Sequence, residues 1–237
     1  MNWFAGMWKE RSIMRRSVLV AVMVLVGSCS LELPGSGAPP RMYILTPKST
    51  FAEDLKKVEW QLLVEIPQSP AGVNTARIAL QDSPIEMRYF QRANWTDFAP
   101  KMVQTLLVES FENSGSIVAV GRQAIGLRSD YILKTDLREF QAEYAERLPE
   151  NVEDGLGNVS PPNIHVRINA KLIKMPRRSI VASENFEFTI AVKENSMQAI
   201  VGGFDDALGK AMRRLVEWTL KSGSEHYVKS DKATPRR

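Results

Sequence analysis

The chain has one cysteine, Cys29, and two histidines, His165 and His226, among its 237 residues. A single cysteine cannot form a disulfide within the chain, so we expect no internal cross-link. The two histidines lie far apart in sequence, and neither has a cysteine or carboxylate spaced as a metal ligand or general base requires. We therefore predict no metal, no catalytic residues and no bound cofactor, and we interpret both histidines as surface residues.

The sequence also lacks a phosphate-binding loop. The pair Gly202-Gly203 does not belong to a Walker sequence and is interpreted as a break before a helix. Asp205-Asp206 could hold a metal, but at the start of that helix two acidic side chains more simply complement its dipole. Any use of ATP would consequently belong to a partner protein.

The first residues have the pattern of an export leader. Arg15 and Arg16 precede an apolar run at residues 18–26, and two small residues then lead to Cys29. This run is much shorter than the roughly twenty apolar residues that a membrane-spanning helix needs. Either Met1 or Met14 could be the first residue of the leader, and the sequence does not decide between them.

The tetrapeptide Val26-Gly27-Ser28-Cys29 resembles the bacterial lipobox. A free cysteine can also pack like a small apolar residue, but its position directly after an apolar run and two small residues favours lipidation. We predict a diacylglycerol and an N-acyl chain on Cys29, which is enough acylation for stable membrane anchoring.

The basic character of the chain comes mostly from the leader. Removing the four basic and one acidic residues at positions 1–28 from the chain's 31 basic and 27 acidic residues leaves a formal net charge of about +1. Nucleic acid binding requires a clustered basic face, so we do not expect it.

Composition divides the chain into four segments. Residues 1–28 are the predicted signal peptide, and residues 29–41, rich in Pro, Gly and Ser, are a flexible tether. Residues 42–222 are expected to form one domain, and residues 223–237 a disordered basic tail that begins at the helix-stopping Gly223.

Strands are predicted where apolar residues recur at every second position. Segments with this pattern begin near Trp60, Ala76, Ile85, Ile117, Tyr131, Ile164 and Phe186. The Ile164 and Phe186 segments are joined by a turn at Pro176 and should pair antiparallel.

Helices are predicted where apolar residues recur every three or four positions. One begins near Pro100 and ends at Gly115, and the other carries an apolar stripe from Phe204 to Trp218. The predicted fold is therefore α+β, with a largely antiparallel sheet of about six strands and two amphipathic helices on one face.

The order of these segments resembles the ABC-type transport auxiliary lipoprotein family, the PqiC-like partners of MCE-domain lipid transporters. The resemblance extends from about Arg41 to Leu220, and no single motif is diagnostic. It rests on the lipobox, Tyr43-Ile44-Leu45, Arg77-Ile78, Ile85-Glu86-Met87-Arg88-Tyr89-Phe90, Asn94-Trp95, Pro100, Asp130-Tyr131-Ile132-Leu133, Leu137-Arg138-Glu139-Phe140, Phe186 and the last helix.

This resemblance implies a non-catalytic, periplasm-facing lipoprotein that works beside an MCE-domain protein, a permease and an ATPase in moving phospholipid. Ser30, rather than Asp, follows the lipidated cysteine, which resembles the signal for the inner leaflet of the outer membrane. An inner-membrane location is the less favoured alternative.

Three aromatic residues are candidates for contacting a partner or lipid: Trp95, Phe90 and Phe140. Trp95 is more simply interpreted as a plug over the core, because aromatic side chains are more often buried. Phe90 and Phe140, with Ile173, alternate out of phase with the predicted core positions. They suggest a second apolar surface and thus association of several copies.

Two other functions remain open on the sequence alone. One is an outer-membrane assembly lipoprotein similar to the lipopolysaccharide-assembly factor, which would bind a barrel protein. The other is a lipid-modifying hydrolase, which would need a nucleophile beside a base such as His165.

Overall fold

The computed structural model describes residues 39–122, 129–149 and 156–233, and residues from Pro40 onward form one compact unit. The predicted signal peptide, Cys29 and most of the predicted tether lie outside the described residues.

Three long strands pair antiparallel in the order β6 (Tyr131–Glu143), β7 (Asn163–Lys174) and β8 (Ser179–Ala191). On β7, Ile164, Val166 and Ile168 are buried while the residues between them are partly exposed, which is the alternation expected of a strand with one covered face. The predicted antiparallel pairing of β7 with β8 is confirmed.

The rest of the sheet is mixed, so the expectation of a largely antiparallel sheet of about six strands is wrong: eight strands are present among the described residues. Strands β2 (Val58–Val64) and β3 (Arg77–Ser83) both run parallel to β6. β5 (Ile117–Gly121) is parallel to β2, and β1 (Arg41–Tyr43) is parallel to β4 (Glu86–Trp95). In this part of the described sheet, the one antiparallel pair is β3 with β4.

The position of β6 explains the parallel pairs. β7 lies along one edge of β6 for its whole length, so β2 and β3 share the other edge. β2 contacts the start of β6, β3 contacts its end, and an isolated bridge from Gln68 to Asp136 lies between them. From β2 through Gln68 to β3, the chain follows this edge of β6 without turning back. β2 and β3 therefore have the same orientation relative to β6.

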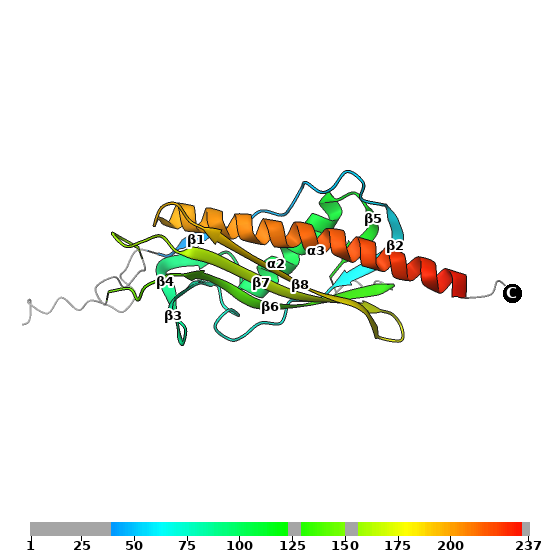
Figure 1. Cartoon of the computed structure of the whole chain (residues 1–237), viewed down its shortest axis with the longest axis horizontal. Helices are drawn as coiled ribbons and strands as arrows, with labels where there is room; N and C mark the ends of the chain where they lie inside the picture. Colours follow the sequence, from blue (N-terminus) through cyan, green and yellow to red (C-terminus); the bar gives the residue numbers. More distant parts are fainter. Residues whose placement is uncertain (1–38, 123–128, 150–155, 234–237) are drawn as a thin grey trace, which may run out of the picture. The chain divides into compact units, whose positions relative to one another are not determined.

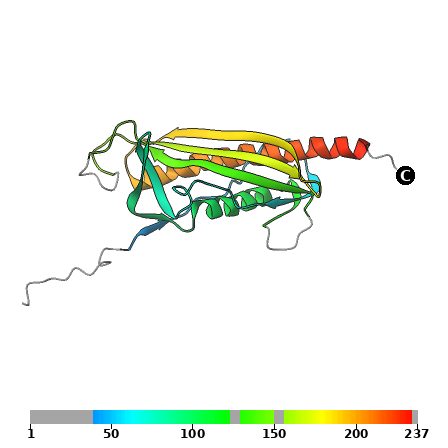
Figure 2. The same ribbon diagram turned by 90° about the horizontal axis from the view of Figure 1, so that it is seen from below.

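Two helices pack into one continuous core with the sheet (Figures 1 and 2). α2 (Ala99–Asn113) begins with Pro100 in its first turn, as predicted, and the chain turns at Gly115, where φ is +60°. α3 lies beside β7 and β8, and it contacts α2 where the Ser110 hydroxyl approaches the Met212 sulfur at 3.7 Å.

Helix α3 (Met197–Ala233) is much longer than predicted. The expected break at Gly202-Gly203 and the expected stop at Gly223 are both inside it, so the prediction of a disordered tail is wrong for residues 223–233. A Cβ on Gly203 would lie 2.7 Å from Cγ1 of Ile164, and one on Gly223 would lie 2.4 Å from Cζ2 of Trp60. These glycines therefore allow close approach of the helix to the sheet.

The C-terminal part of α3 is held by Tyr131. Its hydroxyl donates to the carbonyl oxygen of Gly223 at 3.3 Å and lies 3.0 Å from Nδ1 of His226. Burial, with the nearby charge of Asp130 and Tyr227, raises the pKa of Tyr131 to about 12. No helix in the described part of the chain is both long enough and apolar enough to cross a membrane.

Candidate interaction surfaces

The three aromatic residues proposed to contact a partner are all buried: Trp95 is 1% exposed, Phe90 3% and Phe140 1%. The Trp95 ring lies 5.7 Å from the ring of Phe140 and 5.1 Å from that of Phe204, in edge-on or tilted contacts. The interpretation of Trp95 as a plug over the core is therefore the one the structure favours. The expectation that Phe90 and Phe140 form a second surface is wrong.

Two different causes account for this error. In β6 the register with β7 shifts between Leu137 and Glu139, which turns Phe140 to the same face as Leu137. A one-residue slip moves every later side chain to the opposite face, so simple alternation could not place Phe140. In β4, Phe90 lies before the irregularity at Arg92; the face that carries Phe90 packs into the core, whereas Met87 on the other face is exposed.

The face of the sheet opposite α3 carries a network of charged side chains. Here His165 lies between two carboxylates: its Nδ1 is 2.7 Å from Glu143 and its Nε2 is 2.8 Å from Glu187. The expectation that His165 has no carboxylate partner is therefore wrong, because β6 and β8 bring one from each side. Next to it, Arg167 donates to Glu139, and Lys171 donates to Asp136 at 3.0 Å.

The contacts of His165 determine its charge. A carboxylate only accepts hydrogen bonds, so these contacts favour the protonated imidazole, in which both ring nitrogens donate. Burial by itself lowers the pKa of His165, but the hydrogen bonds to Glu143 and Glu187 and their negative charges outweigh it and raise the pKa above 6.5. In this state neither nitrogen has a lone pair with which to take a proton from a nucleophile.

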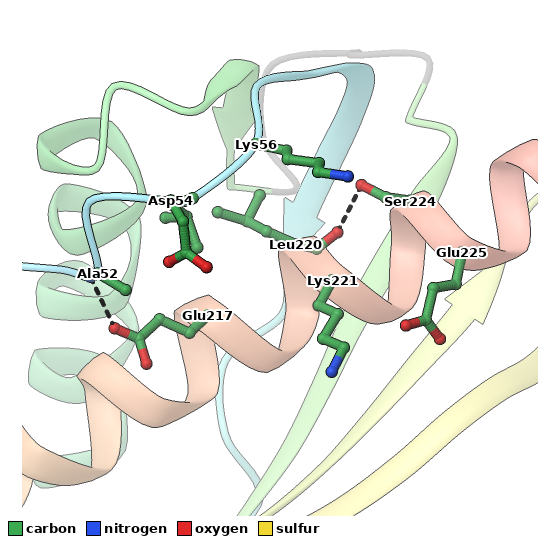
Figure 3. Close-up of a pocket in the computed structure, with 9 residues that line it drawn as sticks. Ala52, Asp54, Lys56, Glu217, Leu220, Lys221, Ser224 and Glu225 are labelled. Carbon is green, nitrogen blue, oxygen red and sulfur yellow. Dashed lines mark hydrogen bonds between the residues drawn. The ribbon is translucent and has the colours of Figure 1, made fainter.

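A pocket of about 430 Å³ lies between α3 and residues 52–56, the segment that precedes β2 (Figure 3). The backbone N–H of Ala52 donates to Glu217 at 3.0 Å, which attaches this segment to the helix. Figure 3 shows the carboxylate of Asp54 pointing toward the helix, while Lys221 and Glu225 point away from the segment. The lining mixes charges of both signs, so the pocket does not select for either an anion or a cation.

On the other side of the same helix is a larger groove, which we call the β8 groove. It is about 730 Å³ in volume, and Glu217 and Lys221 line both hollows. Residues 184–188 of β8 form one wall and α3 forms the other with Arg214 and Trp218. Arg214 and Lys221 are seven residues apart, two helical turns, and this spacing is the only sequence signal that could have indicated the groove.

Asp205 has a structural role. It accepts hydrogen bonds from the backbone N–H of Thr46 at 2.7 Å and from its hydroxyl, and so joins the segment after β1 to α3. Since α3 begins at Met197, Asp205 and Asp206 are not at the helix start, and the expectation that they complement its dipole is wrong. Among the described residues, no group of three or more His, Cys, Asp or Glu is arranged to hold a metal ion.

A family model described as "ABC-type transport auxiliary lipoprotein component" matches residues 43–216. Among solved structures, a protein from Xanthomonas campestris is 30% identical, with a TM-score of 0.70 over 79% of this chain and 98% of that protein. A second crystal structure, of an uncharacterised protein, is 13% identical with a TM-score of 0.56 over 76% of this chain and 97% of that one, which shows a shared fold.

A curated relative, an uncharacterised protein of Bradyrhizobium diazoefficiens, is 25% identical over 194 residues. That alignment covers 80% of this chain but only 48% of the relative, so the chain spans about half the length of this relative.

Proposed function

This chain belongs to the family of ABC-type transport auxiliary lipoprotein components, and from that premise we propose that it is a non-catalytic docking subunit of a lipid transporter. In this proposal it is anchored through acyl chains on Cys29 and faces the periplasm. Its partners are an MCE-domain protein, a permease and an ATPase, and the cargo is phospholipid. The observation that carries the proposal is the family match, which spans most of the described domain.

Two features of the domain support docking rather than catalysis. Carboxylates contact both nitrogens of His165, so when it is protonated this histidine cannot act as a general base. The hollows beside α3 are open and lined by charged side chains on both walls, as the polar rim of a protein interface is.

The membrane location is proposed from the sequence around the lipidation site. Ser30 follows Cys29, and the absence of Asp at that position resembles the outer-membrane signal. Three acyl chains on one cysteine would hold the protein stably without a membrane-spanning helix.

Affinity purification of the full-length lipoprotein from its own membranes tests the proposal. Partners and co-extracted lipids are identified by mass spectrometry, with an unrelated lipoprotein carrying the same tag as control. We expect MCE-domain, permease and ATPase subunits to be enriched together with phospholipid. Enrichment of a barrel protein or a cell-wall protein in their place would contradict the transport role.

A variant at the lipidation site tests the anchor independently. Replacement Cys29→Ser removes the only thiol of the chain and should abolish the acyl mass on the mature protein. If the variant keeps that mass, lipidation at Cys29 is refuted. If it loses the mass but still purifies with the transporter subunits, docking is a property of the domain itself.

A further inference from the structure

Three large apolar side chains are exposed near the first strand of the domain: Met42 is 55% exposed, Ile44 72% and Phe98 53%. Met42 and Ile44 alternate with the partly buried Tyr43 and the buried Leu45, so both point away from the core. A single exposed apolar residue is common on a protein surface, but several gathered in one place mark a contact surface.

The pairing of β1 with β4 gathers these three residues. The backbone N–H of Thr96 donates to the carbonyl oxygen of Tyr43 at 3.1 Å, which joins the end of β1 to the segment after β4. Met42 and Ile44 flank Tyr43, and Phe98 is two residues beyond Thr96. Figure 2 shows β1, in blue, at the rim of the described domain. We call Met42, Ile44 and Phe98 the β1 patch.

Arginines surround the β1 patch. Arg41 begins β1, Arg77 begins β3, and Arg92 lies in β4, the strand between them. Arg41 is paired in register with Ala93 and Arg77 with Asn94, so the backbones of the three arginines lie within about 10 Å of one another across the sheet. None of these arginines forms an ion pair with a described residue.

The acidic residues close to the β1 patch do not cancel this charge. The segments that carry the patch and its arginines contain one acidic residue, Asp97, which pairs with Lys101 at 2.9 Å. A second acid reaches them from α3, where Asp205 accepts hydrogen bonds from Thr46. Three arginines and one lysine against two carboxylates leave two positive charges. An apolar patch with a cationic rim matches an anionic bilayer, whose headgroups attract the arginines while the apolar side chains enter the interface.

The β1 patch also lies where the chain leaves the domain toward its predicted anchor. β1 begins twelve residues after Cys29. Even when fully extended, twelve residues span no more than about 40 Å. A domain attached at this distance meets the bilayer at a high effective concentration, so even a weak contact is populated.

We propose that the β1 patch rests on the bilayer that holds the anchor, with its apolar side chains in the interface and its three arginines against anionic headgroups. A second copy of the chain fits less well, because a symmetric contact would bring the same arginines together. The contact orients the domain, so that the turn between β7 and β8, at the opposite end in Figure 1, is held away from the bilayer. This inference rests on the proposed anchoring at Cys29 and adds the surface through which the domain itself meets the membrane.

A fluorescent label on a single introduced cysteine tests the contact. Full-length lipoprotein is reconstituted in vesicles of equal parts phosphatidylglycerol and phosphatidylethanolamine. Thr96→Cys places the label at the β1 patch, and Ser179→Cys places it at the opposite end of the domain. A lipid with a nitroxide on its headgroup should quench the label at position 96 and not the label at position 179. The parent should take up no label, because the thiol of Cys29 is acylated.

Removal of the apolar side chains shows whether they make the contact. The triple variant Met42→Ser, Ile44→Ser and Phe98→Ser should reduce the quenching at position 96 to the level at position 179. The matched control changes three comparably exposed apolar residues elsewhere: Ile66→Ser, Val118→Ser and Ile180→Ser. This control should keep the quenching of the parent.

Charge reversal tests the arginines separately. Arg41→Glu with Arg92→Glu should weaken the quenching at position 96 in vesicles that contain phosphatidylglycerol, because the reversed charges repel its headgroup. The matched control Arg177→Glu with Arg178→Glu, in the exposed turn between β7 and β8, should leave the quenching unchanged. Replacing phosphatidylglycerol with phosphatidylcholine should weaken the quenching of the parent and reduce its difference from the first variant.

Three outcomes overturn the proposal: no quenching at position 96, equal quenching at both labels, or unchanged quenching in the triple serine variant of the β1 patch. Absence of quenching, together with loss of self-association in that variant, would assign the patch to a second copy. Flotation of the protein with vesicles without quenching at position 96 refutes the contact and leaves the anchor intact. Uptake of label by the parent, or its failure to float, refutes the anchor as well.

Discussion

Replacing Gly223 with alanine should destabilise the protein although alanine is the better helix former. Gly223 lies inside α3 where the helix passes over the indole of Trp60. An added Cβ would lie 2.4 Å from Cζ2 and 3.0 Å from two further atoms of that ring. Trp60 is almost completely buried, so the ring has no open space into which to move.

The magnitude follows from two opposing effects. Alanine in place of glycine stabilises a helix interior by about 1 kcal/mol. Forcing a methyl group into a packed core costs about 1–3 kcal/mol, and the short distances place Gly223→Ala at the upper end. The net change in the free energy of unfolding should be a loss of about 2 kcal/mol, or a melting temperature about 4–8 °C lower.

Gly209 provides the matched control on the same helix, because a Cβ there would meet no atom within 4 Å. Gly209→Ala should therefore raise the stability by about 1 kcal/mol. Urea unfolding of the full-length protein in detergent, followed by far-ultraviolet circular dichroism, measures both variants.

In the Trp60→Phe background, which lacks the ring atoms nearest the new methyl, Gly223→Ala should cost much less than it does in the parent. If Gly223→Ala is as stable as Gly209→Ala, the explanation of the long helix by close packing is refuted.

Three further results are expected. Because the pKa of His165 is raised, its ionic contacts stabilise the fold fully below about pH 6.5 and lose this effect as the pH rises through the folded-state pKa. The urea midpoints of the parent and of His165→Gln should thus differ most below about pH 6.5 and approach one another as the pH rises above it, and a constant difference would contradict this. Tyr131→Phe should cost about 0.5–1.5 kcal/mol and remove the tyrosine that ionises near a pKa of about 12 in an ultraviolet titration. Phe140→Ala should cost about 3–5 kcal/mol in urea unfolding, whereas Ile85→Ala, at a side chain 97% exposed, should change stability by less than about 0.5 kcal/mol; equal effects would refute the assignment of faces.

The charged network and the β8 groove show why the candidate sites were hard to predict. Glu143, His165 and Glu187 come from three strands, and a carboxylate 22 residues away in sequence on either side gives no local signal. Sequence periodicity predicted that His165 faces solvent, and it is indeed on the open face of the sheet. It could not predict which residues of β6 and β8 lie opposite, because that depends on register.

The sequence by itself determined the elements whose pattern is long and uninterrupted. β7 alternates over most of its length and β8 alternates from Phe186 to Ile190, and α2 has a proline at its start and a glycine after its end, so local propensity and periodicity agree there. The order of segments was also sufficient to identify the family.

Only the tertiary structure decided the direction of β2 and β3, the faces of Phe90 and Phe140, and the length of α3. Strand direction depends on how β2 and β3 pair with the edge of β6 that β7 leaves free, and the bulge in β6 turns Phe140 to the other face without any residue type that signals it. At Gly203 and Gly223 a weak local preference against helix is overcome by packing, because only a residue without a side chain lets α3 approach Ile164 and Trp60.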